Sequence, residues 1–499
     1  MVVGPGPRAV VRTPLAGSPH LRVVYADRVN RLPGLFVATA ACTLALHASD
    51  WPRFRGPNGS GVSESANLPA EFGPGRNLVW KTALPPGHSS PIVSGDRIFV
   101  TGVESEKLLT IALDRASGKI LWRRECPRPR NETLDKRNSA ASPTPVSDGQ
   151  NVYVFFGDYG LVSYSFNGDE RWRLPLGPFN NAYGMGASPV IVDGLIVLAC
   201  DQSSGSFIVA AGKDDGKVRW KRERPEALSG HSTPIVYSDR GRSQIIAPSS
   251  FRLDAFDAST GELTWFVRGL ASEMKSVPVL SGDKIYINGF NTPENDPGKQ
   301  IAVADFDDQL SRDDKNKDGK LSQDELTDER AKKYFPFEDI NHDNVLDREE
   351  WRLFALTMAA ENGLLAIRAG GKDDTSTKAI LWKYHKSIPQ LPSVLLYRGV
   401  LYMLSDSGVL TTLDPATGEV HKQARLRGVA DRYFASPVAG AGKVFIASMG
   451  GIITVLEAGA EQKVLAVNDL DDEVFATSAI ADDRLFVRTR SALYCFGAK

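Results

Sequence analysis

The chain has 499 residues and a formal net charge of −1 at pH 7, and charged residues make up 24% of it. This length fits one large repeat architecture or two to three ordinary domains. Both signs of charge are mixed along most of the sequence and no basic stripe occurs, which argues against nucleic acid as a partner.

The first 48 residues are predicted to be an export signal. Three arginines precede an apolar run at 32–46, and small residues follow, with Ala48 as the expected cleavage point. The run is too short and too rich in Ala and Thr for a membrane span, so none is expected after cleavage. The protein is therefore expected to be periplasmic or secreted. Lipid anchoring at Cys42 is the less favoured alternative, because Thr39 stands where such motifs prefer Leu.

Cleavage would leave three cysteines, Cys126, Cys200 and Cys495. They are odd in number and far apart, so the sequence predicts no disulfide framework. We expect them to be small buried apolar residues.

A repeated unit occupies residues 77–291 and 363–499, after an N-terminal extension at 49–76. In seven segments a hydrophobic strand begins after a proline, and an eighth at Thr477-Ser478-Ala479 keeps the frame without one. The seven are Ser90-Pro91, Ser142-Pro143, Ser188-Pro189, Thr233-Pro234, Val277-Pro278, Leu391-Pro392 and Ser436-Pro437. A period of about 40 to 50 residues with four short strands per unit predicts a β-propeller.

A glycine four residues before a tryptophan recurs near the end of the units. The pairs are Gly118/Trp122, Gly168/Trp172, Gly216/Trp220 and Gly261/Trp265. The glycine is expected to supply a positive φ in the turn between the two outer strands. The tryptophan is expected to pack over the neighbouring blade, and the proline to start the innermost strand.

The two ends of the repeat region predict how the ring closes. The last unit, Phe475 to Phe496, supplies only three strands, and an unassigned fourth strand stands upstream at Asn77–Lys81. Pairing the two would remove a free edge. The expected fold is therefore all-β, an eight-bladed β-propeller of four-stranded antiparallel blades.

The unit at Phe256-Asp257-Ala-Ser-Thr260-Gly261-Glu-Leu-Thr-Trp265 resembles the repeat of the pyrroloquinoline-quinone-like propeller family. The leader Asp50-Trp-Pro-Arg-Phe-Arg-Gly-Pro-Asn-Gly59 is similar to the opening of secreted members. The resemblance covers residues 50–499 apart from an insertion. It implies the propeller fold. It leaves activity open, because the family contains quinoprotein dehydrogenases and non-catalytic scaffolds of outer-membrane barrel assembly alike.

The insertion, residues 292–362, carries two calcium-loop patterns of the EF-hand type. Such a loop needs oxygen ligands at positions 1, 3, 5 and 9, a main-chain carbonyl at 7 and a bidentate carboxylate at 12. In the first loop these positions are Asp314, Asn316, Asp318, Ser322, Lys320 (carbonyl) and Glu325. In the second they are Asp339, Asn341, Asp343, Asp347, Val345 (carbonyl) and Glu350. At position 6, Gly319 and Asn344 suit the left-handed backbone that the turn requires. The sequence therefore predicts two calcium sites.

The rest of the insertion is expected to be helical. A helix over Gln323–Phe335 is predicted to end where Pro336 breaks it. An exit helix over Arg348–Glu361 has an apolar face, expected to pack inside the module or on a blade: Trp351, Leu353, Phe354 and Met358. Exported proteins meet millimolar calcium, so a structural role for the ions is the default expectation.

The insertion lies between the second and third strands of the fifth unit, on the same face as the loops that join successive blades. We therefore expect it to overhang the mouth where a ligand would enter. The polar candidates on those loops are His88, Arg137, Asn138, Asn181, Tyr183, His231, Glu273, Arg432, Tyr433 and Glu473.

Three functions compete. The favoured one is a non-catalytic scaffold whose loop-rich face binds an envelope protein or a carbohydrate. The alternative that the resemblance implies is a pyrroloquinoline-quinone-dependent dehydrogenase, with calcium and a pair of adjacent cysteines at the cofactor. The chain has no adjacent cysteines, which disfavours that cofactor. The third candidate is a hydrolase that uses His88, His231 and Glu273. It is supported only by the polar character of these residues, and histidines in loops mostly form hydrogen bonds with the neighbouring backbone.

Overall fold

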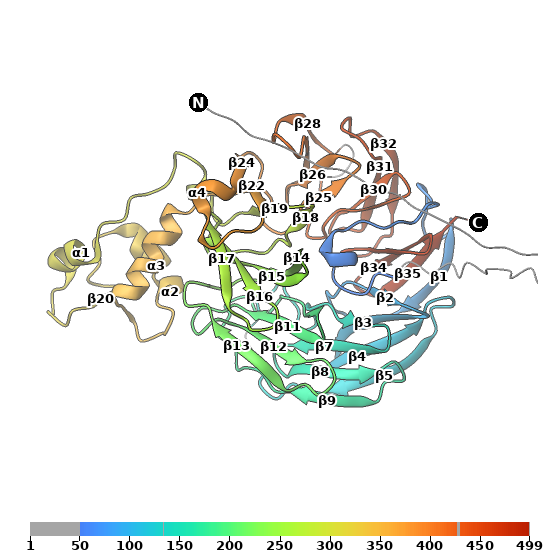
Figure 1. Ribbon diagram of the computed structural model, residues 1–499, viewed down its shortest axis with the longest axis horizontal. Coiled ribbons are helices and arrows are strands. Elements are labelled where there is room, and N and C mark those ends of the chain that lie inside the picture. Colours follow the sequence, from blue (N-terminus) through green and yellow to red (C-terminus); the bar gives the residue numbers. More distant parts are fainter. Residues whose placement is uncertain (1–49, 133, 427–429, 499) are drawn as a thin grey trace, which may run out of the picture. The chain divides into compact units, whose positions relative to one another are not determined.

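The computed structural model describes residues 50–132, 134–426 and 430–498. The predicted export signal and Cys42 lie outside the described residues. Eight four-stranded antiparallel blades follow one another around a ring, which confirms the predicted fold (Figure 1). The closing blade has the order β1-β35-β34-β33, so the strand upstream of the first repeat completes the last one, as predicted.

Blades 1 to 4 run in chain order from the innermost strand outward. Blade 1 contains β2 (Ile92–Ser94), β3 (Arg97–Glu104), β4 (Lys107–Asp114) and β5 (Ile120–Cys126). Blade 2 contains β6 (Val146–Ser147), β7 (Asn151–Phe156), β8 (Gly160–Ser165) and β9 (Glu170–Leu174). Blade 3 contains β10 (Val190–Val192), β11 (Leu195–Cys200), β12 (Phe207–Gly212) and β13 (Val218–Glu223). Blade 4 contains β14 (Ile235–Asp239), β15 (Arg242–Ser249), β16 (Arg252–Asp257) and β17 (Leu263–Arg268).

Blades 5 to 8 complete the ring. Blade 5 contains β18 (Val279–Ser281), β19 (Lys284–Gly289), β22 (Gly363–Arg368) and β24 (Ile380–Tyr384). Blade 6 contains β25 (Leu395–Tyr397), β26 (Val400–Leu404), β27 (Val409–Leu413) and β28 (Val420–Arg425). Blade 7 contains β29 (Val438–Gly440), β30 (Lys443–Ala447), β31 (Ile452–Glu457) and β32 (Val464–Asp469). Blade 8 contains β33 (Ala479–Ala481), β34 (Arg484–Arg488), β35 (Ala492–Gly497) and β1 (Leu78–Ala83). Between β22 and β24, β23 (Asp373–Asp374) pairs in parallel with β17, and α4 (Ser376–Ala379) follows it.

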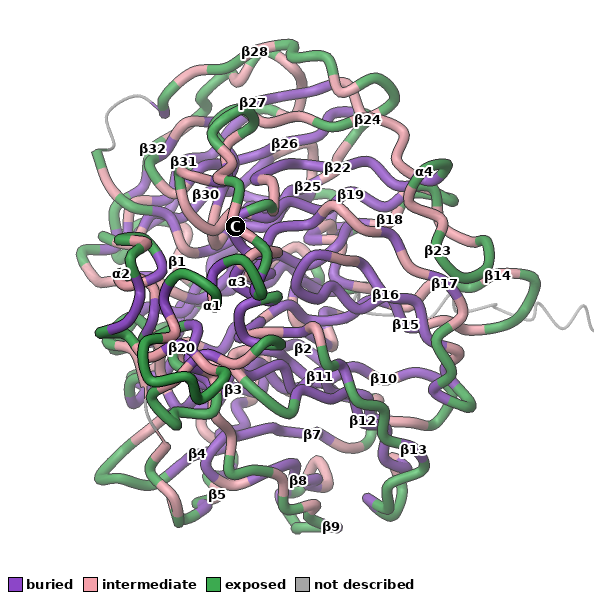
Figure 2. Tube along the Cα trace, turned by 90° about the vertical axis from the view of Figure 1, so that its left-hand side faces the viewer, coloured by how far each residue is buried: buried purple, intermediate pink, exposed green. Residues whose placement is uncertain are grey.

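The hydrophobic core lies between adjacent blades, and the outermost strands alternate buried and exposed positions (Figure 2). Tryptophans of the outer strands pack on the turn glycine of the next blade, as predicted. Trp80 lies so close to Gly118 that a Cβ there would be 2.4 Å from the ring, and the glycine φ is +72°. The same contact recurs at Trp122/Gly168, Trp172/Gly216, Trp220/Gly261 and Trp382/Gly418.

Hydroxyl groups tie the innermost strands together around the channel. The main-chain N–H of one blade donates to the hydroxyl of the next at 2.9–3.0 Å. These bonds are Ser90→Thr144, Thr144→Ser188, Ser188→Thr233, Val277→Ser393, Ser393→Ser436 and Ser436→Thr477. Two predicted repeat frames therefore shift by two residues. The position equivalent to Ser90 is Thr144 rather than Ser142 in blade 2, and Ser393 rather than Leu391 in blade 6.

The N-terminal extension crosses the channel. Trp51 bridges to Val93 in blade 1, and the 3-10 helix η1 (Pro57–Gly59) follows. Arg53 donates to the main-chain oxygen of Pro234 in blade 4 at 2.6 Å, and Arg55 to that of Val394, just before β25 of blade 6, at 2.7 Å. These three partner positions lie beside or within the innermost strands of three different blades, so the extension spans the channel from blade to blade.

The insertion in blade 5 begins after β19 and includes the 3-10 helix η2 (Pro293–Asn295). It then forms α1 (Phe306–Asp313), β20 (Leu321–Ser322), α2 (Glu329–Glu338), β21 (Val345–Leu346) and α3 (Arg348–Ala359). Figure 1 shows these elements beyond the blades, next to blades 3 to 5. The apolar face of α3 packs against α1 and α2 inside the insertion through Trp351, Phe354 and Met358. This is one of the two packing alternatives that the sequence predicted. No helix in the described ranges is long and apolar enough to span a membrane.

The predicted helix over Gln323–Phe335 is wrong at both ends. The helix starts at Glu329, because the Asp328 side chain caps it by accepting from two main-chain N–H groups. It also continues through Pro336 to Glu338. Proline cannot donate to the carbonyl four residues earlier, but that oxygen, on Lys332, accepts instead from the side chain of Gln323 at 2.9 Å.

Candidate functional site

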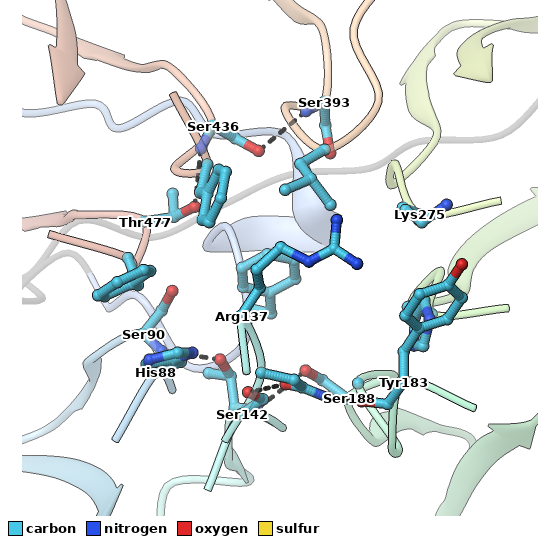
Figure 3. A pocket seen from close by; sticks show the side chains of 18 of the residues that line it. His88, Ser90, Arg137, Ser142, Tyr183, Ser188, Lys275, Ser393, Ser436 and Thr477 are labelled. Atoms are coloured by element: carbon cyan, nitrogen blue, oxygen red, sulfur yellow. Dashed lines mark hydrogen bonds between the residues drawn. The ribbon is translucent and has the colours of Figure 1, made fainter. Parts of the chain in front are cut away.

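A central cavity of about 240 Å³ opens at the end of the channel where the inter-blade loops meet (Figure 3). Phe54 of the N-terminal extension lines it, and so do six members of the hydroxyl ring: Ser90, Thr144, Ser188, Ser393, Ser436 and Thr477. Each of these hydroxyl oxygens except that of Ser90 accepts a hydrogen bond from a main-chain N–H of the preceding blade. The apolar lining adds Phe434, Phe475 and Leu391.

The ten polar candidates divide into three groups. Five line the central cavity: His88, Arg137, Asn138, Tyr183 and His231. Asn181 and Glu273, again with Tyr183, line a second cleft described below. The remaining three, Arg432, Tyr433 and Glu473, line neither; Tyr433 is fully buried and Glu473 pairs with Arg490 at 2.8 Å.

The two cavity histidines are neutral at physiological pH. Burial, followed by the positive field of Arg488 and Arg490, lowers the pKa of His88 to about 4. Burial, followed by Lys275, lowers the pKa of His231 to about 3. His88 stacks on Phe475 with ring centroids 4.2 Å apart. Both imidazole rings are therefore flat, uncharged parts of the cavity lining.

Asp135 and Glu273 each already have a cationic partner. Asp135 accepts two hydrogen bonds from the Arg137 guanidinium, at 2.6 and 2.9 Å, and this contact lowers the pKa of Asp135 to about 2. Glu273 accepts from Lys275 at 2.6 Å rather than facing an imidazole. The arrangement therefore lends no geometric support to hydrolysis by His88, His231 and Glu273.

Several residues that line the central cavity were not predicted from the sequence. Phe434 and Phe475 stand two residues before the Ser436 and Thr477 positions of the repeat, so their place in the frame was a usable signal. Lys275 lies two residues before the Val277 position in the same way. Phe54 had no such signal, because only the folded path of the extension brings it to the cavity.

The second predicted calcium loop brings its carboxylates together. One oxygen each of Asp339, Asp343 and Glu350 lie within 4.8 Å of one another, the only such group among the described residues. Glu350 accepts from the main-chain N–H groups of loop positions 2, 3 and 9, at 3.0–3.3 Å. Asn344, at position 6, has the expected positive φ of 66°. The carboxylates therefore face inward on a loop whose backbone wraps around them.

The first predicted loop repeats this hydrogen-bond pattern. Glu325 accepts from the N–H groups at positions 2, 3 and 9, and Asp314 from those at positions 5 and 6. Gly319 has a φ of 79°. The loops are joined by the short β20–β21 pairing, in which Leu321 faces Leu346. The ammonium of Lys320 also reaches Asp343 of the second loop at 3.0 Å.

A cleft of about 500 Å³, which we call the module cleft, separates the insertion from the loop-rich face. On the insertion side it is lined by Tyr334, Pro336–Ile340, His342, Thr357 and Met358, and on the blade side by Phe179–Tyr183, Ser203, Leu228, Ser229, Ser272, Glu273, Asn291, Thr292 and Gln390. Asn180 donates to the main-chain oxygen of Ile340 at 3.2 Å. The insertion therefore overhangs the mouth, as its position between the second and third strands of blade 5 predicted.

Glu338 lies inside the module cleft and is 8% exposed. Burial, followed by the like charges of Glu273 and Glu350, raises the pKa of Glu338 to about 8. A nearby cation would have the opposite effect on this carboxyl.

Comparison with known proteins gives the same fold. Residues 110–293 match the family described as outer membrane protein assembly factor BamB. No curated protein matches the chain in sequence.

Three solved structures illustrate the likeness in fold. BamB from Moraxella catarrhalis is 10% identical, with a TM-score of 0.51 over 84% of this chain and 99% of that one. A quinohemoprotein alcohol dehydrogenase from Comamonas testosteroni is 12% identical, with a TM-score of 0.56 over 90% and 81%. The computationally designed Ika8 protein is 10% identical, with a TM-score of 0.51 over 87% and 99%.

The resemblance predicted from the repeats is thus confirmed, and at these identities the structural likeness establishes the fold rather than an activity. The chain is an eight-bladed β-propeller that shares its architecture with BamB and with quinoprotein alcohol dehydrogenases, and its residues 110–293 match the BamB family model.

Proposed function

We propose that the chain is an exported, non-catalytic binding protein that holds two calcium ions in its insertion and presents its loop-rich face to an envelope protein or a carbohydrate. The observation that carries this proposal is the module cleft, in which the second calcium loop and the inter-blade loops form opposite walls. The BamB family match supports a scaffold function. The ions have a structural role: they hold the module over the face that binds.

The alternative is a quinone-dependent dehydrogenase with its cofactor in the central cavity. The residues there do not fit such a cofactor with its own calcium. Asp135 is the one carboxylate among the described lining residues, and Arg137 occupies both of its oxygens. The described cysteines, Cys126, Cys200 and Cys495, are buried in the blades and line neither cavity.

The deciding experiment is reconstitution of the purified chain with pyrroloquinoline quinone and calcium. We expect that the protein fraction after gel filtration shows no absorbance from the quinone and that the protein catalyses no dye-linked oxidation of alcohols. Retained quinone together with alcohol oxidation would overturn the proposal in favour of the dehydrogenase. If no quinone is retained and no alcohol is oxidised, the partner is then sought by pull-downs from envelope extracts, in the presence of calcium and in the presence of a chelator.

A further inference from the structure

The central cavity has aromatic rings on two opposite sides. Tyr183 lies on the connection between blades 2 and 3, and Phe434 on that between blades 6 and 7. Connections four blades apart face each other across a ring of eight, so these two rings are opposite. For the same reason His231, between blades 3 and 4, faces Phe475, between blades 7 and 8. All four rings are half-buried, so each keeps part of its surface free for a ligand.

The side view of this arrangement is completed by His88 and Phe54. His88 stacks on Phe475 and lies across the cavity from Tyr183 (Figure 3). Phe54 stands between two arginines that bond to the oxygens of Pro234 and Val394, each one residue beyond the start of an innermost strand. Its ring therefore lines the end of the cavity that points into the channel. Such a lining suits a ligand with apolar faces.

The hydroxyl ring supplies unused hydrogen-bonding capacity between these aromatic sides. Its six members in the cavity belong to residues that are more than nine-tenths buried, and none of them donates its hydroxyl hydrogen to any other described residue. These are Ser90, Thr144, Ser188, Ser393, Ser436 and Thr477. A hydroxyl that accepts one main-chain N–H keeps a lone pair and its own hydrogen. Buried polar groups normally use such capacity, so a ligand rich in donors and acceptors is indicated.

The lining carries no charge that calls for a charged ligand. Among the described lining residues, Arg137 is paired with Asp135, and Lys275 is paired with Glu273 beside the cavity. The two histidines are neutral, so each imidazole offers one donor and one acceptor. The chemistry of the cavity therefore matches a neutral ligand with two apolar faces and an edge of hydroxyl groups.

We propose that the central cavity binds a neutral pyranose, the terminal sugar of a glycan. The C–H faces of the sugar lie against the opposed aromatic rings, and its hydroxyl edge bonds to the hydroxyl ring. The cavity of about 240 Å³ is small for a ligand pocket and holds one sugar ring. Tyr183 and Gln390 line both this cavity and the module cleft, so the rest of the glycan leaves through that cleft. This rests on the proposed function, because it selects carbohydrate as the ligand of the loop-rich face.

The test is saturation-transfer difference NMR on the purified, calcium-loaded chain. The probes are the methyl pyranosides of glucose, galactose and mannose, and at least one is expected to bind saturably. Its ring C–H protons should receive more saturation than its methoxy group, because the ring faces contact the aromatic side chains. Its uronic acid counterpart should bind about tenfold more weakly, because the cavity offers no unpaired cation for the carboxylate.

Ser90→Ala tests the hydroxyl ring without disturbing the fold. The Ser90 hydroxyl bonds to no described residue, so its removal breaks no hydrogen bond within the protein, and sugar binding is expected to weaken about three- to tenfold. The matched control is Ser281→Ala, at the exposed end of the innermost strand β18, which should bind as the parent does.

Phe434→Leu tests the aromatic sides. The variant keeps an apolar side chain but loses the flat ring, so binding should weaken about two- to tenfold while the melting temperature stays close to that of the parent. The control is Phe266→Leu, a half-buried ring on the outer strand β17, which should retain binding.

The inference would be overturned if none of the three pyranosides bound, if the uronic acid bound as tightly as its neutral counterpart, or if Ser90→Ala and Phe434→Leu both bound as the parent does. Strongest saturation at the methoxy group would likewise contradict a stacked sugar ring. Failure of the proposed function is a separate result, retained quinone with alcohol oxidation, and it is measured without any sugar.

Discussion

Arg55 donates from its guanidinium to the main-chain oxygen of Val394 at 2.7 Å, across 339 residues of sequence. It is fully buried, and a second bond reaches the oxygen of Gly59 at 3.1 Å. Burial lowers the pKa of Arg55 to about 9, so the side chain is still charged at neutral pH. The N-terminal extension is thereby bonded to the wall of the channel that it crosses.

Replacing Arg55 with Met is expected to destabilise the propeller. Two buried carbonyl oxygens lose their donor, and each loss costs about 1–3 kcal/mol, so a decrease of about 2 kcal/mol or more is expected in urea unfolding. The control is Arg76→Met in the same extension, since Arg76 is 66% exposed. Its effect should stay within about 0.5 kcal/mol. Equal urea midpoints for the two variants would show that the extension is not a stabilising element.

A second prediction concerns the turn glycines. Gly118→Ala would place a Cβ 2.4 Å from the Trp80 ring at a φ of +72°, so the variant suffers both backbone strain and a collision. Gly149→Ala has a φ of +89° with no atom within 4 Å, so it suffers the strain alone. Thermal unfolding should therefore show a larger loss for Gly118→Ala, by about 1–3 kcal/mol, the cost of overpacking. A loss as small as that of Gly149→Ala would mean that Trp80 does not pack on this turn.

A third prediction is a pH dependence from His231. Its pKa is lowered to about 3 in the folded chain, whereas an unfolded histidine has a pKa near 6.5. As pH falls from 6.5 towards 3, only the unfolded chain takes up this proton, so folding stability falls across that window and is unaffected above it. His231→Gln should reduce the slope of stability against pH between 6 and 4 by up to about 1.4 kcal/mol per pH unit.

The measurement is a set of urea midpoints between pH 4 and 8. The control is His421→Gln, an exposed residue on β28, which should leave the slope as in the parent. An unchanged slope in His231→Gln would contradict the burial of a neutral imidazole at the cavity.

The sequence predicted the features that depend on local spacing. The start of the innermost strand recurs in every blade, and the glycine–tryptophan pair recurs in blades 1 to 4, so the number of blades and the closing strand β1 could be derived without coordinates. The position of the insertion followed from the order of strands in blade 5. These patterns report hydrogen bonding and packing between neighbours in the repeat.

Features that depend on distant contacts could not be derived. The hydrogen bond from Arg53 to Pro234 joins residues that are 181 positions apart, and no local sequence pattern predicts it. The start of α2 depends on the Asp328 cap, and its continuation past Pro336 depends on Gln323 reaching Lys332. The burial of Glu338 arises only when two separate segments form the module cleft.

Calcium binding is tested most directly by a calorimetric titration of the purified chain with calcium. We expect two ions per chain, one fewer in Glu325→Gln and in Glu350→Gln, and none in the double variant, because each glutamate supplies the bidentate ligand of its loop. A chelator should lower the melting temperature of the parent and leave that of the double variant unchanged. No calcium binding by the parent, or binding undiminished in the double variant, would contradict the calcium sites on which the proposed function depends.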